Sequence, residues 1–472
     1  MFFVALLYAP WAYGCTTAAT IIGLNWIIAG TLALWVIERT IFLVAGRVRP
    51  DKSDERGDLV LSIPWLLAAT CFLLLGIGWW MVVNASAIYD SAFLTFVPLG
   101  RVASGLPGSV DRAISMAWMV RATLLLGVTC FVADLTRRPK WLLQLWWAIA
   151  LTGGSIALLG LIQKASDAPM IFWELTSGPP VTTFFATYYY HANAGAYLNL
   201  VFPLTVGLAA RLMVTPQPPW VRAIALTMAI AVTVAILANT SRAAQGIGVG
   251  LMILVGFLSA KPLKQVVRRA ERITIALGVC LTGLAIWAVA QASHLDRPLE
   301  RWSHISESLS NDARWLASQA ALHGLPQAGW FGFGPGTFRV VFPYLTGPLG
   351  TRIGGFWRFL HEDYLQTILE WGWIGSALWA FLFFGGMVLA LRRMRKSGRE
   401  WLPRQRTLLS LVLLALTGVA LHALVDFPLQ IASIQLYVAT YLGVCWGATS
   451  SWRRSYQLSL SGYQEDQVTT KS

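Results

Sequence analysis

Charged residues are scarce in this chain of 472 residues, and that scarcity excludes most soluble folds. Only 12% of the side chains are charged, whereas 56% are hydrophobic. This balance leaves too little polar surface to coat a folded domain in water. Several apolar runs approach or exceed the roughly 20 residues that cross about 30 Å of hydrocarbon as a helix, and the 23 Trp residues suit the interfacial belts of a membrane. The composition therefore predicts an all-α, polytopic membrane protein.

Cysteines and clustered metal ligands are also few. The five Cys residues, at positions 15, 71, 130, 280 and 445, fall in or at the ends of apolar segments. Neither a disulfide framework nor a metal cluster is therefore indicated, and the sequence contains no Asp-x-Asp pair. The N-terminus lacks the basic n-region and the small-residue cleavage site of a signal peptide, so we expect a retained first helix.

Acidic residues are outnumbered by basic ones, which gives the chain a net charge of +14. An excess of this size could indicate a nucleic-acid partner. However, the Lys and Arg residues lie in short stretches between apolar runs, as the loops of a membrane protein require. We therefore expect membrane lipids as neighbours and no nucleic acid.

The apolar runs predict about twelve transmembrane helices. The first run is short and contains Pro10, which makes it the weakest of the set. The predicted spans are 2–14, 20–45, 59–83, 114–134, 141–162, 191–211, 222–239, 243–260, 273–292, 362–391, 406–425 and 430–448.

The basic residues predict the side of the membrane on which each loop lies. Most of the 36 Lys and Arg residues fall in alternate loops and in the C-terminal tail, whereas the loops between them are longer and contain few. Because basic loops stay in the cytoplasm, both termini are expected inside and the long loops outside. The basic loops lie near 47–56, 137–140, 211–222, 261–272 and 392–406, and the long loops near 84–113, 163–190 and 293–361.

The loop at 293–361 is too long for a structureless connection, and loops of this size usually carry function. Its residues 298–324 have apolar side chains at helical spacing, whereas 324–355 is rich in Gly, Pro and aromatic residues. We expect helix in the first part and a folded coil on the membrane surface in the second. The predicted domains are helices 1–9 in 1–292, a periplasmic loop subdomain in 293–361, helices 10–12 in 362–448 and a cytoplasmic tail in 449–472.

The external side collects unusual polar residues, most densely in the run His361-Glu362-Asp363-Tyr364-Leu365-Gln366. This run opens the tenth span, so His361 would lie at a helix N-terminus with acidic residues in the first turn. Helical spacing places Tyr364 on the same face as His361. A lone histidine here would more often be an interfacial capping residue, but the polar residues around it favour a functional role.

Three arginines stand out against this apolar background. Arg242 lies in the turn between two spans, where it either reaches lipid head groups or binds an anionic ligand. Arg314, by its spacing alone, is a solvated loop residue. Arg121 lies about two turns inside the fourth span, where an ionisable side chain is costly and is either functional or paired with an acid in the bundle.

These motifs resemble the signature of the O-antigen ligase and polymerase family. The most specific part is His361-Glu-Asp-Tyr-Leu-Gln, followed by Glu370-Trp-Gly-Trp-Ile-Gly375. The supporting parts are in the family's order and extend from about 185 to 430. They are Tyr190-His-Ala-Asn193, Ser241-Arg242, Arg314-Trp315, Gly332-Phe-Gly-Pro-Gly-Thr-Phe338 and His422-Ala-Leu-Val-Asp426.

The resemblance implies a glycosyltransferase type C-like membrane enzyme. Such an enzyme transfers a glycan from an undecaprenyl-diphosphate carrier to a hydroxyl of a growing polysaccharide or of lipid A core, at the periplasmic face of the bacterial inner membrane. His361 would be the general base, and Arg242 and Arg314 would clamp the diphosphate, with inversion and without a metal or cofactor. The implied substrate-binding residues are Arg121, Tyr190, His191, Asn193, Asp363, Tyr364, Gln366, His422 and Asp426.

Two other classes of protein remain open from the sequence. A transporter or lipid-oligosaccharide flippase would suit the number of spans, although transporters often contain repeated halves and a midplane site. A structural membrane subunit would leave the Arg242, Arg314 and His361 set without a role. Within the resembling family, the sequence does not separate ligase, polymerase and protein glycosylation.

Overall fold

The computed structural model describes most of the chain. The described residues are 1–48, 63–100, 102–103, 105–175, 183–269, 313–347, 353, 355–396 and 403–449. Within them, nine helices are long and apolar enough to cross a membrane. The chain is therefore a multi-pass, all-α membrane protein.

Each predicted span that falls on described residues is a helix. The predicted span 273–292 lies outside the described residues. The short α1 (Phe2–Trp11) contains Pro10, and α17 (Ala432–Ala448) is the last helix. The others are α2 (Ala18–Val48), α3 (Trp65–Val83), α4 (Arg112–Leu135), α5 (Pro139–Ala165), α6 (His191–Val214), α7 (Pro219–Ala238), α8 (Arg242–Arg269), α14 (Asp363–Ala380), α15 (Gly386–Lys396) and α16 (Pro403–His422).

The core of the bundle is formed around α17, whose side chains are almost all buried and which packs along α4. Gly443 and Gly447 lie one turn apart on α17, where the backbone of α4 comes very close. A Cβ at Gly443 would lie 2.8 Å from the carbonyl oxygen of Thr129, and one at Gly447 would lie 2.6 Å from that of Ala133. Small residues at this spacing let two membrane helices approach closely.

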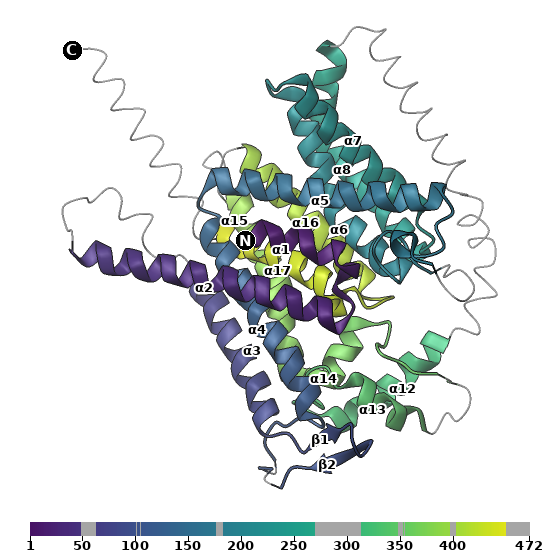
Figure 1. The fold of residues 1–472 in the computed structure, drawn as a ribbon. Coiled ribbons are helices and arrows are strands. Elements are labelled where there is room, and N and C mark those ends of the chain that lie inside the picture. Colours follow the sequence, from purple (N-terminus) through teal and green to yellow (C-terminus); the bar gives the residue numbers. More distant parts are fainter. Residues whose placement is uncertain are drawn as a thin grey trace.

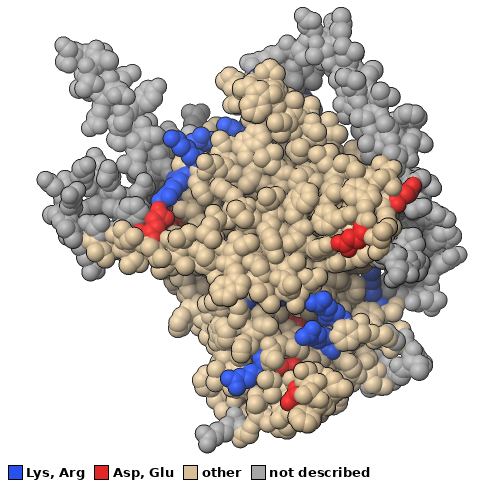
Figure 2. Space-filling view, in the orientation of Figure 1, with Lys and Arg blue, Asp and Glu red and all other residues tan. Residues whose placement is uncertain are grey.

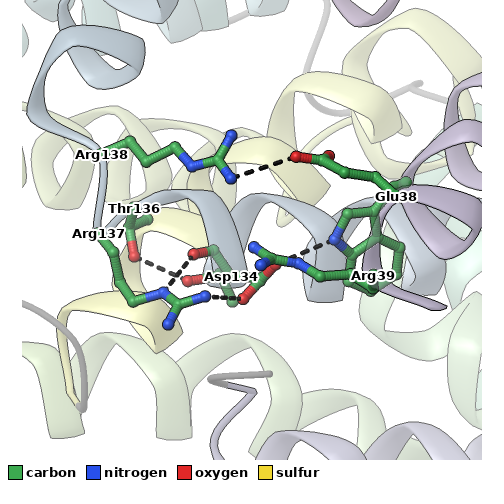
Figure 3. A network of polar contacts seen from close by, with 8 residues as sticks. Glu38, Arg39, Asp134, Thr136, Arg137 and Arg138 are labelled. Carbon is green, nitrogen blue, oxygen red and sulfur yellow. Dashed lines mark hydrogen bonds and ion pairs between the residues drawn. The ribbon is translucent and has the colours of Figure 1, made fainter. Parts of the chain in front are cut away.

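Buried charges at the C-terminal end of α4 pair with one another. Asp134 accepts hydrogen bonds from Arg39 of α2 and from Arg137, which lies just beyond α4 (Figure 3). Both ion pairs are buried, whereas the neighbouring pair of Arg138 and Glu38, 3.3 Å apart, is half-exposed. A buried charge is costly without a partner, so these contacts fix the ends of α2 and α4 together.

The predicted periplasmic loop is more regular than expected. Of the predicted helical part 298–324, residues 298–312 lie outside the described residues and the remainder is helical, in α12 (Ala313–Ala328). The stretch predicted as coil contains the helix α13 (Phe338–Thr346). Phe338 and Phe342, one turn apart, pack against each other in a small apolar core shared with α12 and α14, and this packing accounts for the helix. Figure 1 shows α12 and α13 beside α14.

A two-stranded hairpin occupies the other long loop that precedes α4. It pairs β1 (Ala87–Asp90) with β2 (Thr95–Pro98) in antiparallel register and lies at the same end of the bundle as α13 (Figure 1). Only this short hairpin interrupts the helical architecture among the described residues. It leaves the predicted fold class unchanged.

Candidate active site

His361 lies directly before α14, in the position predicted from the sequence. Glu362 caps the helix by accepting hydrogen bonds from the backbone N–H groups of Tyr364 and Leu365, and burial raises the pKa of its carboxyl. The backbone of His361 has φ +64°, in the left-handed region. The hydrogen bond from Leu360 N to Gln366 Oε1 (3.0 Å) fixes the chain on one side of this turn.

The His361 imidazole is oriented by Asp426, which follows α16. Nδ1 of His361 and Oδ1 of Asp426 are 2.9 Å apart. Because a carboxylate only accepts, Nδ1 carries the proton in neutral His361, and the lone pair of Nε2 is free to accept another. Burial alone would raise the pKa of Asp426, but its hydrogen bond with His361 and the nearby positive charge hold that pKa below its usual value.

Arg314 joins this pair through Tyr190. The guanidinium of Arg314, at the start of α12, donates to the Tyr190 hydroxyl at 2.8 Å. The hydroxyl in turn donates to Oδ2 of Asp426 at 3.4 Å. Burial and the charge of Asp426 raise the pKa of Tyr190 to about 12, so this hydroxyl stays protonated at neutral pH. Three predicted site residues and His361 thus form one chain of polar contacts.

Aromatic rings enclose the His361 imidazole. Phe427 meets it edge-to-face at 4.6 Å between ring centroids, and Trp357 does so at 5.8 Å. The Tyr190 ring stacks on the Phe427 ring, with 5.7 Å between the ring centroids. The sequence analysis assigned no role to Phe427 or Trp357, although both are close to site residues along the chain.

Arg242 is the first residue of α8, and the start of α8 is held against the start of α6. Asn239 makes this connection, because its Nδ2 donates to the His191 carbonyl at 2.9 Å while its Oδ1 accepts from Ser241 N at 2.8 Å. Arg242 itself is partly buried. The helices that carry Arg242 and Tyr190 therefore begin side by side at the site end of the bundle.

A cavity of ≈ 1040 Å³ opens beside this cluster, between the starts of α2, α4 and α6. Tyr190, Phe427 and Asn193 form part of its wall, and so does Arg121. The guanidinium of Arg121 lies 5.6 Å from the ring centroid of Trp118, an arrangement typical of a cation–π contact. In Figure 2 much of the visible face is uncharged, and basic side chains gather at its upper left and in its lower part.

The family comparison agrees with this geometry. Residues 226–380 match the family model described as O-antigen ligase. This segment, which is less than half of the chain, is similar to the O-antigen ligase family. The matched segment contains Arg242, Arg314 and His361 but ends before Asp426, which only the structure places beside His361. No curated protein matches the chain.

Several predicted substrate-binding residues have internal partners in the structure. The buried Asp363 carboxylate accepts from Leu429 N at 2.8 Å and from Gln430 Nε2 at 3.0 Å. The Tyr364 hydroxyl donates to the Ala420 carbonyl at 2.8 Å, and Gln366 Oε1 accepts from the backbone N–H of Leu360, the residue before His361. These contacts hold α14 against α16 and the segment after it. A direct contact of these side chains with substrate stays a prediction.

The two remaining predicted histidines differ in their surroundings. His191 is the first residue of α6, and its Nδ1 lies 3.1 Å from the carbonyl oxygen of Thr183 in the preceding loop. His422, at the end of α16, is 1% exposed, and neither ring nitrogen has a hydrogen-bond partner among the residues that the structure describes. Their roles as substrate contacts likewise stay predictions.

Glu370 fixes the glycine-rich loop beside the cavity. Its carboxylate accepts from Gly336 N at 2.9 Å and from Phe338 N at 3.2 Å, while Gln366 donates to it at 3.1 Å. The loop therefore folds back onto α14, which connects α13 to the helix that begins after His361. From the sequence, a folded coil is predicted for this glycine-rich segment, and Glu370 is predicted only as part of the family signature.

No group of three His, Cys, Asp or Glu side chains in the described ranges is arranged to hold a metal ion. The absence of a metal requirement stays a prediction, because this geometric finding does not test the reaction. The basic residues of the site end are the groups available to bind an anionic substrate.

Proposed function

We propose that this protein transfers a glycan from an undecaprenyl-diphosphate carrier to an acceptor hydroxyl on a growing polysaccharide or on lipid A core. The observation that supports this most strongly is the His361–Asp426 pair, whose Nε2 is left to accept a proton, together with Arg314 two hydrogen bonds away. The O-antigen ligase match over 226–380 supports the same class of reaction.

In the proposed step, the acceptor oxygen attacks the anomeric carbon of the donor sugar. The bond between this carbon and the diphosphate oxygen breaks, and the acceptor proton passes to Nε2 of His361. The buried carboxylate of Asp426 stabilises the imidazolium that forms, as an orienting acid does in a catalytic triad. A single displacement of this kind inverts the anomeric centre.

Arg314 and Arg242 are proposed to stabilise the leaving undecaprenyl diphosphate. Negative charge grows on its bridging oxygen as the sugar bond breaks, and the guanidinium group matches phosphate oxygens with two parallel hydrogen bonds. Fixed positive charge at this position acts on the transition state more than on the bound donor. Because the arginines supply this charge, the proposed step needs no divalent ion.

The proposed site lies on the periplasmic side of the bacterial inner membrane. The basic loops support this orientation, because loops rich in Lys and Arg stay in the cytoplasm. In the predicted topology, these loops, at 47–56, 137–140 and 392–406, lie at the end of the bundle opposite the proposed site. The lipid donor would then present its glycan where the acceptor is assembled.

The test is glycan transfer by the purified, full-length protein in lipid nanodiscs, with a lipid-diphosphate donor and a hydroxyl acceptor. We expect His361→Ala to lower the transfer rate by about 10²- to 10⁴-fold, because a general base contributes roughly that much, while donor affinity stays nearly unchanged. Excess chelator should leave the parental rate intact.

Three outcomes would contradict this proposal. Parental transfer by His361→Ala would remove the general base, and loss of activity in chelator with rescue by magnesium would show a metal requirement. Movement of labelled glycolipid across sealed vesicles without formation of a glycosidic bond would identify a transporter instead.

A further inference from the structure

The ≈ 1040 Å³ cavity carries an excess of positive charge that the proposed donor site does not use. Four arginines line it, Arg112, Arg121, Arg339 and Arg358, against a single carboxylate, Glu370. That carboxylate is already bound by two backbone N–H groups and by Gln366. Most of the cavity's positive charge is therefore not neutralised by its own wall.

These four arginines have no hydrogen bond or ion pair with any described residue. Arg121 contacts the face of Trp118, and Arg358 lies over Phe359 with its guanidinium 5.4 Å from the ring centroid. Arg358 also interacts unfavourably with Arg339, and burial together with this like charge lowers the pKa of Arg358. Of the four, Arg121 alone is attracted to a described acidic residue, Glu370. Four arginines that converge on one cavity with a single acidic neighbour indicate an anionic ligand.

A second, apolar cavity of ≈ 430 Å³ adjoins the first. The two share Trp118, Arg121, Glu370 and Gln430 in their walls. The rest of the second cavity is lined mainly by Leu, Trp and Phe side chains of α4, α14 and α17, and by the π-helical turn η5 (Phe381–Gly385). Its volume lies within the roughly 300–1,000 Å³ typical of small-molecule sites, and π-helical turns occur frequently at functional sites. A ligand that fills both cavities has an anionic head and a hydrocarbon chain.

The cavity borders the proposed catalytic cluster, which consists of His361, Asp426, Tyr190 and Arg314. Tyr190 and Phe427 form part of its wall, and both contact the His361 ring. Arg314 reaches the cluster from α12 through the Tyr190 hydroxyl and is not part of this wall. The arginines of the cavity are thus a different set from Arg314 and Arg242, which do not line it.

We propose that the two adjoining cavities form the acceptor site, and that the acceptor is a lipid with a phosphate-bearing head group. The four arginines hold the phosphate, and the apolar cavity takes the first part of the hydrocarbon chain. The assignment of this site to the acceptor rests on the proposed function, in which Arg242 and Arg314 hold the donor. Phosphorylated lipid A and a second lipid-diphosphate-linked glycan share this chemistry, and the choice between them separates a ligase from a polymerase.

The first test measures binding to the full-length protein in detergent by native mass spectrometry. The probes are bisphosphorylated lipid A and undecaprenyl diphosphate, each in competition with phosphatidylglycerol. The variants are Arg112→Ala with Arg339→Ala for the cavity, Arg314→Ala for the donor side, and Arg138→Ala as a control at the far end of the bundle. Arg112 and Arg339 are exposed, so their loss should leave the thermal unfolding temperature unchanged.

The cavity variant should weaken binding of lipid A, or of a second undecaprenyl diphosphate, by roughly 10- to 100-fold, as expected for lost charge-assisted hydrogen bonds. Arg314→Ala and Arg138→Ala should leave that binding unchanged. Unaltered binding in the cavity variant would overturn the proposal. Equal displacement by phosphatidylglycerol would also overturn it, because the arginines would then be ordinary contacts with bulk lipid.

The second test separates acceptor from donor by kinetics. In the cavity variant the KM for acceptor should rise roughly 10-fold or more while the KM for donor is unchanged, and Arg339→Lys should recover part of the loss. A rise in donor KM alone would assign the cavity to the donor and overturn this inference, while glycan transfer itself would stand. If the parental protein transfers no glycan, the proposed function fails, and the acceptor assignment, which rests on it, fails as well. Lipid binding by the four arginines would then still be decided by the first test.

Discussion

At the scale of single residues, the site depends on how one histidine is held. His361 has a left-handed backbone, which costs a non-glycine residue energy and persists only where the surroundings fix it. Two hydrogen bonds fix the backbone of His361. On one side the Leu360 N–H donates to Gln366 Oε1, and on the other the Asp363 N–H donates to the Ala423 carbonyl at 2.9 Å. The turn aims the ring at Asp426 rather than along α14.

The ionised form of Asp426 also contributes to stability. Its native pKa lies below the usual value because of its contact with His361, although burial opposes this. A depressed carboxylate pKa stabilises the fold above the unfolded value, about pH 4, and the contribution is lost as the pH falls through the lower native pKa. The His361–Asp426 contact should therefore persist throughout the neutral range.

We expect Asp426→Asn to reduce the transfer rate by more than about 10-fold while donor affinity is maintained. The amide no longer stabilises the imidazolium and can favour the wrong tautomer of His361. Removing this negative charge should also move the acidic limb of the pH–rate profile to lower pH. The profile of Asp426→Asn, measured beside that of the parental protein, checks this. An unchanged profile would show that Asp426 does not act through His361.

We expect Arg314→Lys and Arg242→Lys each to lower kcat/KM for the donor by about 10-fold or more. Lysine keeps the charge but loses the planar fork, so the diphosphate would be held by one contact in place of two. Steady-state kinetics with varied donor measure the effect, and Arg138→Lys at the far end is the matched control. Parental kinetics in both site variants would exclude a bidentate clamp.

At the scale of elements, the glycine-rich loop and α14 are built to contact each other. Gly332 and Gly372 both have positive φ, and their backbones meet where a side chain would not fit. A Cβ on Gly332 would lie 2.5 Å from the backbone of Glu370. The contact keeps α13 close to the helix that begins after His361.

We expect Gly372→Ala to lower both stability and activity. Its backbone, at φ 63° and ψ −171°, lies in a region open essentially to glycine alone, so alanine should cost about 1–3 kcal/mol before any clash with the Trp330 backbone is counted. Thermal unfolding and the transfer assay measure the two effects. Gly250→Ala in α8 is the control, because a Cβ there meets nothing within 4 Å. Equal behaviour of the two variants would remove the proposed coupling between loop and site.

At the scale of the whole molecule, helices that are distant in sequence bring their polar ends together. Arg121 near the start of α4, Tyr190 before α6, Arg242 at the start of α8 and His361 before α14 all lie at one end of the bundle, while the ion pairs of Asp134 lie at the other end of α4. Alternating spans produce this arrangement, because every second helix end faces the same side of the membrane.

We expect the site end to face the periplasm. Single cysteines at Ala103 and Gly347, introduced into a cysteine-free variant, should react with an impermeant thiol reagent added outside the inner membrane. A cysteine at Lys264, in the basic C-terminal part of α8, should react only after this membrane is permeabilised. The reverse pattern would place the active site in the cytoplasm and contradict the proposed donor chemistry.

The sequence by itself determined the membrane class and the described spans, and its family resemblance predicts the three residues proposed for chemistry. Apolar runs must be helical in hydrocarbon, because every backbone polar group needs an internal partner there. The His361 motif is local as well, since the cap at Glu362 and the start of α14 depend on consecutive residues.

Only the tertiary structure decided which residues surround that histidine. Asp426 is 65 positions from His361 along the chain, and Tyr190 is 124 positions from Arg314, so no local pattern could pair them. Helix α13 was missed because packing of Phe338 and Phe342 overrides the Gly and Pro content of its segment. Along the sequence, Arg112, Arg339 and Arg358 fall in predicted loops, whereas Arg121 falls inside a predicted span. Only packing of the bundle placed the four around one volume, because a cavity is a property of several elements at once.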